Sequence, residues 1–145
     1  MNKPLAKIKI IPAKYNPFIK DFQHYYHAHI FETKQQMWEA GAKLSPWDKD
    51  ADGGYGAITI PCRREKHHEG NWITAPKIGD VLFYKDCLGS ECISHEAVHM
   101  ATNYLRFKNQ LLLTDQIDEN EEKLAYCIGS CTRQIVDNLY KLKIL

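Results

Sequence analysis

Three ionisable side chains within five residues, His95, Glu96 and His99, have the spacing of a metal site with a neighbouring base. On a helix, residues four apart lie on one face, so both imidazoles can reach the same metal ion. The carboxylate of Glu96 then lies where it can take a proton from a water molecule bound to that metal. A helical His-Glu-x-x-His pattern therefore indicates zinc-dependent hydrolysis of peptide bonds.

The residues around this pattern favour a helix that is buried over most of its circumference. Its apolar side chains are Ile93, Ala97, Val98, Met100, Ala101 and Leu105. Burying ionisable groups is costly unless something compensates them, and a metal ion would do so. The alternative is an amphipathic helix whose polar strip, with both histidines, faces solvent. The scarcity of other polar residues in the helix favours the metal.

A catalytic zinc ion usually has three protein ligands and one open position, so the chain must supply one more ligand. Glu122 and Glu121, at the start of a predicted second helix, are the two candidates. Glu122 shares a helix face with the small residues Ala125 and Gly129, which would let two helices approach closely. Glu121 begins a face that is more typical of core packing. In a third interpretation both glutamates are solvated and complement the helix dipole.

Composition indicates the broad class of protein. At 145 residues the chain is long enough for one domain, 1–145, with a hydrophobic core. The formal net charge of +1 gives no reason to expect nucleic acid or a membrane surface as a partner. The sequence has no membrane-spanning apolar run and no signal peptide, and its five cysteines, an odd number, fit reduced thiols. We therefore expect a cytoplasmic protein.

The pattern of apolar and polar residues predicts strands and helices along the whole chain. Strands are expected at 5–11, 22–31, 55–60, 71–75 and 80–85. Helices are expected at 34–44, at about 90–107 and at about 119–143. Thr33 and Gln36 have the spacing of a capping box for the first helix, and Ser90 or Ser94 is expected to cap the second. A surface loop is predicted at 45–54 and a charged loop or hairpin tip at 62–70.

The pairing of the His-Glu-x-x-His helix with a downstream Glu122-Lys-Leu-Ala125 helix resembles the gluzincin branch of the zincin metallopeptidases. Val81-Leu-Phe-Tyr84 and the turn at Leu88-Gly89 are similar to the strand and turn before the motif helix in the smallest such domains, which occur in phage and mobile-element proteins. The resemblance covers residues 79–140. It implies an α+β fold, a minimal zincin-like domain whose small, mainly antiparallel sheet packs on the motif helix and the C-terminal helix.

The same resemblance implies roles for individual residues. His95, His99 and Glu122 would be zinc ligands, and Glu96 the general base. Residues 80–85 would form an edge strand along which an extended peptide or protein substrate pairs. The chain departs from the family at Tyr126, because several families have Asp or Asn there. We expect Tyr126 to donate a hydrogen bond to a ligand or to the oxyanion of the transition state.

Other groups capable of chemistry have simpler interpretations. His27 and His29 share a strand face and could bind a metal, but they have no obvious carboxylate or cysteine partner at short range. An exposed polar strand face is therefore favoured. Four of the cysteines lack the spacing of a zinc knuckle, and we expect them to be buried free thiols: Cys87, Cys92, Cys127 and Cys131.

The sequence thus predicts a zinc metallopeptidase in which Glu96 activates a water molecule bound to zinc. The alternative is a catalytically inactive, zinc-stabilised domain that binds a partner protein, such as an inhibitor of a host protein. A metal-free structural protein is a third hypothesis.

Overall fold

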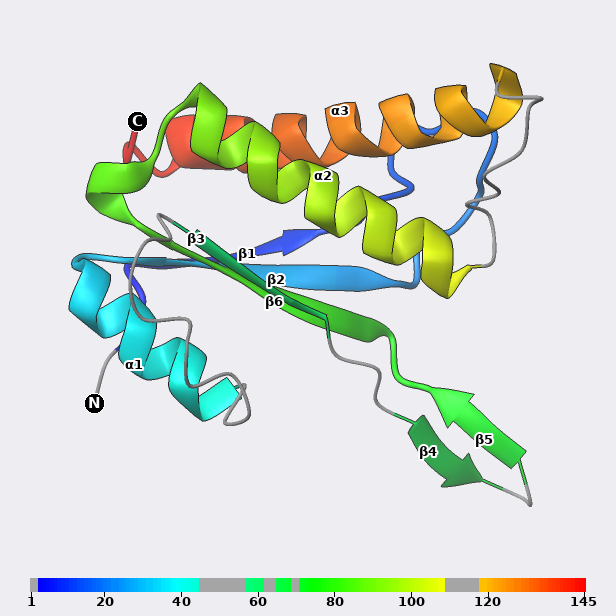
Figure 1. Ribbon diagram of the computed structural model, residues 1–145, viewed down its shortest axis with the longest axis horizontal. Helices are drawn as coiled ribbons and strands as arrows, with labels where there is room; N and C mark the ends of the chain where they lie inside the picture. Colours follow the sequence, from blue (N-terminus) through cyan, green and yellow to red (C-terminus); the bar gives the residue numbers. More distant parts are fainter. Residues whose placement is uncertain (1–2, 45–56, 62–64, 69–70, 109–117) are drawn as a thin grey trace.

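The computed structural model describes residues 3–44, 57–61, 65–68, 71–108 and 118–145. It has an α+β fold, in which two helices lie on one face of a four-stranded sheet and one helix lies on the other (Figure 1). The fold class implied by the resemblance is therefore confirmed. The loop predicted at 45–54 lies outside the described residues.

The sheet is mixed, with two antiparallel pairings and one parallel pairing. Its strands, in spatial order, are β1 (Ala6–Ile10), β2 (Tyr25–Phe31), β6 (Lys77–Tyr84) and β3 (Ala57–Pro61). The parallel pair is β2 and β6. A separate two-stranded hairpin consists of β4 (Glu65–His68) and β5 (Asn71–Thr74), so the predicted hairpin tip includes a strand.

Strand β6 lies in the interior of the sheet. It pairs with β2 on one side and with β3 on the other, and its residues 78–83 are all buried. A strand covered on both faces has a continuous apolar run instead of an alternating pattern. The prediction that 80–85 is an edge strand is therefore wrong. Among the described strands, β3 is the one at that edge.

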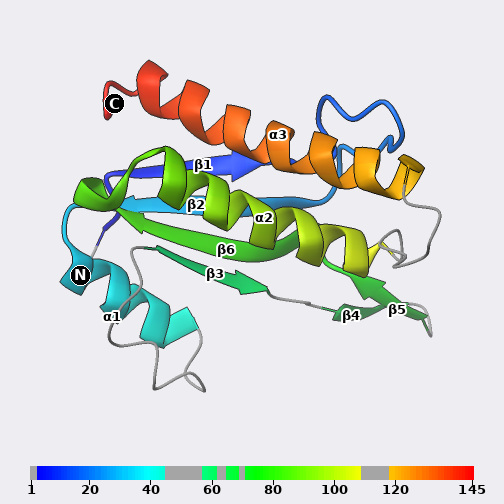
Figure 2. The ribbon, with the colours of Figure 1, turned by 45° about the horizontal axis from the view of Figure 1, so that its top comes forward.

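Two helices cover one face of the sheet and run in opposite directions (Figures 1 and 2). Helix α2 (Ser90–Phe107) lies along β3, and α3 (Asp118–Lys141) lies along β1 and α2. The core between these helices and the sheet includes Ile10, Tyr26, Ala28, Val81, Phe83, Met100, Tyr104 and Ile135. The Tyr26 hydroxyl donates a hydrogen bond to the Met100 carbonyl oxygen, at 3.2 Å, and so joins β2 to α2.

Helix α1 (Lys34–Leu44) covers part of the other face, where Met37 packs against Phe31 and Leu82. Its start is the predicted capping box. The Gln36 amide donates to Thr33 Oγ1 at 3.2 Å, and the Thr33 amide donates to Gln36 Oε1 at 3.3 Å. No described helix combines the length and the apolar character that crossing a membrane requires.

The segment between β1 and β2 is hydrogen-bonded to the two long helices, α2 and α3. Asp21 accepts hydrogen bonds from His24 Nδ1 at 2.7 Å and from the Tyr104 hydroxyl of α2 at 2.8 Å. Gln134 of α3 bonds both the amide and the carbonyl of Ile11. These contacts fix α2 and α3 relative to the start of the sheet.

A glycine in β6 is predicted to be required by its neighbours. A Cβ on Gly79 would lie 2.8 Å from the Ile60 carbonyl oxygen and 2.5 Å from the Tyr26 ring. Gly79→Ala should therefore lower the free energy of unfolding by about 1–3 kcal/mol in urea denaturation. Gly129 on α3 has nothing within 4 Å of such a Cβ, so Gly129→Ala should raise that free energy by about 0.5–1 kcal/mol. Equal effects at both positions would contradict the packing described.

The contacts of Asp21 predict an acid-dependent loss of stability. Burial raises the pKa of Asp21, but hydrogen bonds from His24, Tyr104 and the Gln23 amide outweigh it and lower the pKa from 3.8 to about 2. The stabilisation is therefore complete above pH 3.8 and is lost as the pH falls towards 2. Asp21→Asn should cost about 1–3 kcal/mol at pH 7 and progressively less in acid, measured by urea denaturation.

The matched control is Asp137→Asn. Asp137 is exposed and pairs with Arg133 one turn away on α3, at 3.5 Å. An exposed pair of this kind contributes about 0.5 kcal/mol or less. A similar pH dependence for the two variants would show that Asp21 is not the source of the acid effect.

Candidate metal centre

Helix α2 places the two histidines one turn apart on its exposed face. The Nε2 atoms of His95 and His99 are 3.2 Å apart, and the ring centroids are 4.9 Å apart. This separation is that of an N–H···N hydrogen bond between the two rings, and it is also compatible with one cation bound by both nitrogens.

The separation of these nitrogens fits a zinc ion. A tetrahedral zinc ion with Zn–N bonds of 2.0–2.1 Å holds two imidazole nitrogens about 3.3 Å apart. His95 and His99 match this value without any change of the helix backbone. Imidazole is also a preferred zinc ligand. The two residues thus fit two of the positions of a zinc centre.

The helix around the histidines is amphipathic and is not largely buried, contrary to the sequence prediction. Its exposed strip contains Glu91, Ser94, His95, Val98, His99 and Arg106. The opposite side is buried because the helix packs on β3 and on α3 at the same time. Solvent can therefore reach the imidazoles directly.

Glu96 points the other way, into the protein. Its side chain is only 5% exposed, and its carboxylate accepts a hydrogen bond from the Thr59 hydroxyl of β3. Thr59 belongs to the edge strand and lies far from Glu96 in the sequence. Sequence reasoning missed Thr59 because nothing in the sequence links this strand to α2. The fold thus holds the predicted base between its own helix and the edge of the sheet.

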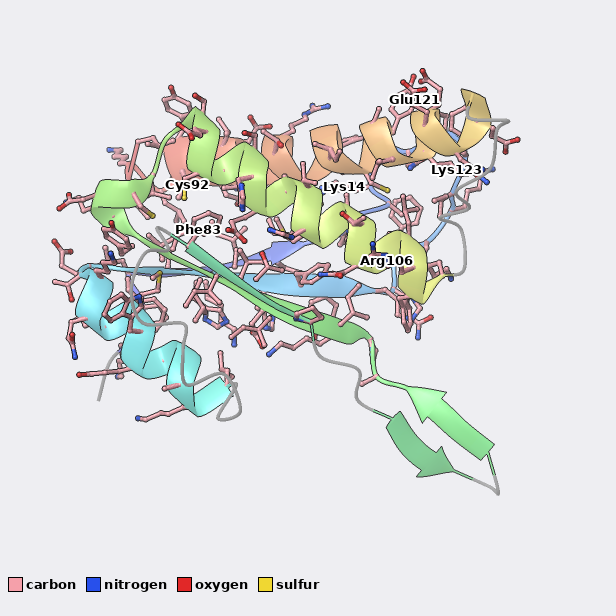
Figure 3. The ribbon with its side chains drawn as sticks, in the orientation of Figure 1. Lys14, Phe83, Cys92, Arg106, Glu121 and Lys123 are labelled. Carbon is pink, nitrogen blue, oxygen red and sulfur yellow. The ribbon has the colours of Figure 1, made fainter. Side chains whose placement is uncertain are left out.

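The described residues contain no group of three His, Cys, Asp or Glu side chains able to hold a metal ion. Glu121 and Glu122 are both exposed, in the first turn of α3. Because α2 and α3 run in opposite directions, this turn lies near the end of α2. Figure 3 shows Glu121 at the end of the helix pair where Arg106 lies, pointing away from α2. Arg106 is about two helical turns beyond His99.

The predicted contact face of α3 is also wrong. Ala125 and Gly129, which share the face of Glu122, are exposed. The buried stripe instead contains Cys127, Cys131, Ile135 and Leu139. Burying these larger apolar side chains stabilises the fold more than close backbone contact at small residues would. The role of Glu122 as third ligand stays a prediction.

Tyr126 is 43% exposed, one turn after Glu122. Its ring centroid lies 6.0 Å from that of Phe18, in the segment between β1 and β2. This contact orients the Tyr126 ring towards that segment. Its hydrogen bond to a ligand or an oxyanion stays a prediction.

The second histidine pair has a carboxylate partner that the sequence did not reveal. Asp80 of β6 is 3% exposed and accepts hydrogen bonds from His29 Nε2 and Lys77 Nζ, both at 2.8 Å. Burial raises the pKa of Asp80, but these two bonds outweigh it and keep the pKa below its usual range. Lys77 thus already provides the cation beside Asp80. Burial, followed by Lys7 and Lys77, lowers the pKa of His27 to about 4.

Comparisons with known proteins assign the chain to no family. No protein-family model matches the chain, and neither a curated protein nor a solved structure matches it. The resemblance to gluzincins therefore rests on the residues of the two helices and of the strand and turn before them.

The buried contact between Thr59 and Glu96 predicts energetic coupling. Thr59→Val would leave a buried carboxylate without this donor, which should lower the free energy of unfolding by about 1–3 kcal/mol. In a Glu96→Ala background the same change should cost much less, so a double-mutant cycle should give a coupling of about 1–2 kcal/mol. Urea denaturation of the four proteins measures it.

Thr102→Val is the control for this cycle. The Thr102 hydroxyl donates only within its own helix, to the Val98 carbonyl. Its replacement should change stability by less than about 0.5 kcal/mol in either background. Additivity of the Thr59 and Glu96 changes would refute the coupling.

Proposed function

We propose that this protein is a zinc-dependent peptidase whose site is built on α2. The observation that carries the proposal is the 3.2 Å separation of His95 Nε2 and His99 Nε2, which fits two zinc ligands. The neighbouring Glu96 supports it, because a carboxylate beside two such ligands is the base that peptide hydrolysis needs.

A zinc ion held by His95 and His99 would supply Lewis acidity, which would acidify a bound water and polarise the scissile carbonyl. The Glu96 carboxylate accepts the proton of the attacking water and later delivers it to the leaving amine. The Thr59 hydroxyl positions this carboxylate against β3.

The substrate we propose is an extended peptide that pairs with β3. Among the described strands, β3 has a partner only on the side of β6, so within the described residues its other side has no strand partner. Extended peptides bind such edges by adding a strand. Since Thr59 of β3 holds Glu96, a peptide bound along β3 passes beside the proposed base.

One observation favours the alternative, a catalytically inactive zinc-stabilised domain that binds and inhibits a partner protein. The described residues bring only two ligands together, and the exposed Glu122 does not join them. In that case zinc binding would persist without peptide cleavage. The experiment below separates the two functions.

We predict that Glu96→Gln retains zinc and loses cleavage. Loss of a general base should lower kcat by about 10²–10⁴-fold, because water activation is lost while both imidazoles remain. Loss of a residue that only supports a metal ligand weakens metal binding by up to about 100-fold. His95→Ala and His99→Ala each remove a proposed ligand itself, so each should weaken zinc binding by more than this. Zinc titration by calorimetry and cleavage of a mixed peptide library, followed by mass spectrometry, measure the two effects.

Glu39→Gln is the matched control, because Glu39 is an exposed glutamate on α1, on the other face of the sheet. It should leave both zinc affinity and cleavage unchanged. Glu122→Ala and Glu121→Ala, compared in the same titration, identify the third ligand by the larger loss of affinity. If the parent protein binds zinc stoichiometrically but cleaves no peptide, the peptidase proposal is refuted and the inactive binding domain is favoured.

A further inference from the structure

The sheet face that α1 partly covers carries a row of rings along β2 (Figure 1). Tyr25, His27 and His29 alternate with residues buried under α2 and α3, so their side chains lie on the α1 side of the sheet. The ring centroids of Tyr25 and His27 are 5.0 Å apart, and those of His27 and His29 are 6.2 Å apart. All three side chains are partly exposed. Phe31, the next residue on this face, packs against α1 and ends the exposed row.

Lysines lie on both sides of this row. In the antiparallel pairing of β1 and β2, Lys7 and Lys9 are opposite two of the rings, so both lysines lie on the same face of the sheet. Both are exposed, and Lys9 Nζ lies 4.5 Å from the centroid of the Tyr25 ring. Lys77 of β6 is opposite Tyr25 on the other side of the row. The rings are therefore flanked by cations from two neighbouring strands.

The carboxylate on this face is buried and compensated. Asp80 is opposite His27 and is 3% exposed, and its Oδ1 atom bonds both His29 Nε2 and Lys77 Nζ at 2.8 Å. The described strand residues of this face thus set three lysines against one buried carboxylate. Burial, followed by Lys7 and Lys77, lowers the pKa of His27 to about 4, as expected where the local potential is positive.

We propose that this surface binds single-stranded nucleic acid through six side chains, namely Lys7, Lys9, Tyr25, His27, His29 and Lys77. Bases of any sequence stack on aromatic rings, and lysines beside the rings bind the phosphates. An acidic peptide would match only the lysines, because carboxylates do not stack on rings as bases do. The net charge of +1 gave no reason to expect nucleic acid, since it sums over the whole chain and not over this face.

This surface is separate from the proposed zinc site. Helix α2, with His95 and His99, lies on the opposite face of the sheet (Figure 1). The proposal therefore does not depend on zinc or on peptide cleavage.

Salt dependence tests the role of the lysines. The probe is a fluorescein-labelled oligothymidylate of about 12 nucleotides, a length that one small domain can occupy, and binding to the full chain is followed by fluorescence anisotropy. Each phosphate contact to a single strand contributes about −0.7 to the slope of log K against log salt concentration. Three contacting lysines give a slope of about −2, and the double variant Lys7→Gln, Lys9→Gln should give about −0.7. An unchanged slope would overturn the proposal.

Lys141→Gln is the matched control, because Lys141 is an exposed lysine at the end of α3, on the opposite face of the sheet. It should leave both the affinity and the slope unchanged. A loss as large as that of Lys7→Gln or Lys9→Gln alone would refute the assignment to the β2 side of the sheet.

Tyr25→Leu tests the stacking, because leucine is apolar but cannot stack on a base. The affinity should fall about tenfold, while the salt slope stays at the parental value. Urea denaturation checks that the variant folds. Unchanged affinity in a folded variant would contradict the role of the ring.

Two competitors test the same point in the parent protein, whether or not the Tyr25 variant folds. The probe annealed to its complement should bind at least about tenfold more weakly than the single strand, because pairing hides its bases. An oligoglutamate peptide at the concentration of the strand should not displace it. Equal binding of the duplex, or displacement by the peptide, would overturn the proposal, and displacement would favour an acidic protein as the partner.

Discussion

The burial of β6 is the constraint on which the rest of the fold depends. Its residues 78–83 are covered on both faces and both edges, so every neighbour must fit closely against it. Leu82 packs against α1 on one face, while Val81 and Phe83 belong to the core under α2 and α3 on the other. Asp80 is buried within the same strand and is tolerated because His29 and Lys77 both bond to it.

The position of α2 follows from this core, and it divides the His-Glu-x-x-His residues between two environments. Consecutive residues on a helix point about 100° apart, so His95 and Glu96 cannot both face the same way. With Ile93, Ala97 and Met100 buried, Glu96 must face inward and the histidines outward. The result is a desolvated carboxylate beside two solvated imidazoles. Thr59 compensates part of the cost of burying the carboxylate.

Local features of the sequence predicted local structure well. The capping box of Thr33 and Gln36, the range of α1 and the extent of α2 depend on residues close together in the chain, and all were confirmed. The cap of α2 was not, because Gly89 occupies the N-cap position without a side-chain bond. Gly89 has an extended backbone at this position, and neither Ser90 nor Ser94 is the N-cap residue.

Features that depend on distant parts of the chain were not predictable in the same way. The apolar run of β6 does not by itself show whether the strand lies inside the sheet or at its edge. Its interior position follows from the strand order, which places β3 beside it. The partners Asp80 and His29 are distant in the sequence and meet only through the parallel pairing of β2 and β6. The predicted phase of α3 is wrong because the helix packs through its larger apolar side chains, Cys127, Cys131, Ile135 and Leu139, and not through its small residues.

Zinc binding at the exposed strip of α2, as proposed, would carry an electrostatic requirement. A metal-bound imidazole is neutral, so two histidines leave the double charge of a zinc ion uncompensated. The carboxylates on the same helix are Glu91, one turn before His95, and Glu96, next to it. Residues 91, 95 and 99 follow one another at intervals of four, which places all three on one strip. If a zinc ion binds there as proposed, Glu91 would supply negative charge on the solvent side and Glu96 on the protein side, because the described residues bring no carboxylate of α3 to the two histidines.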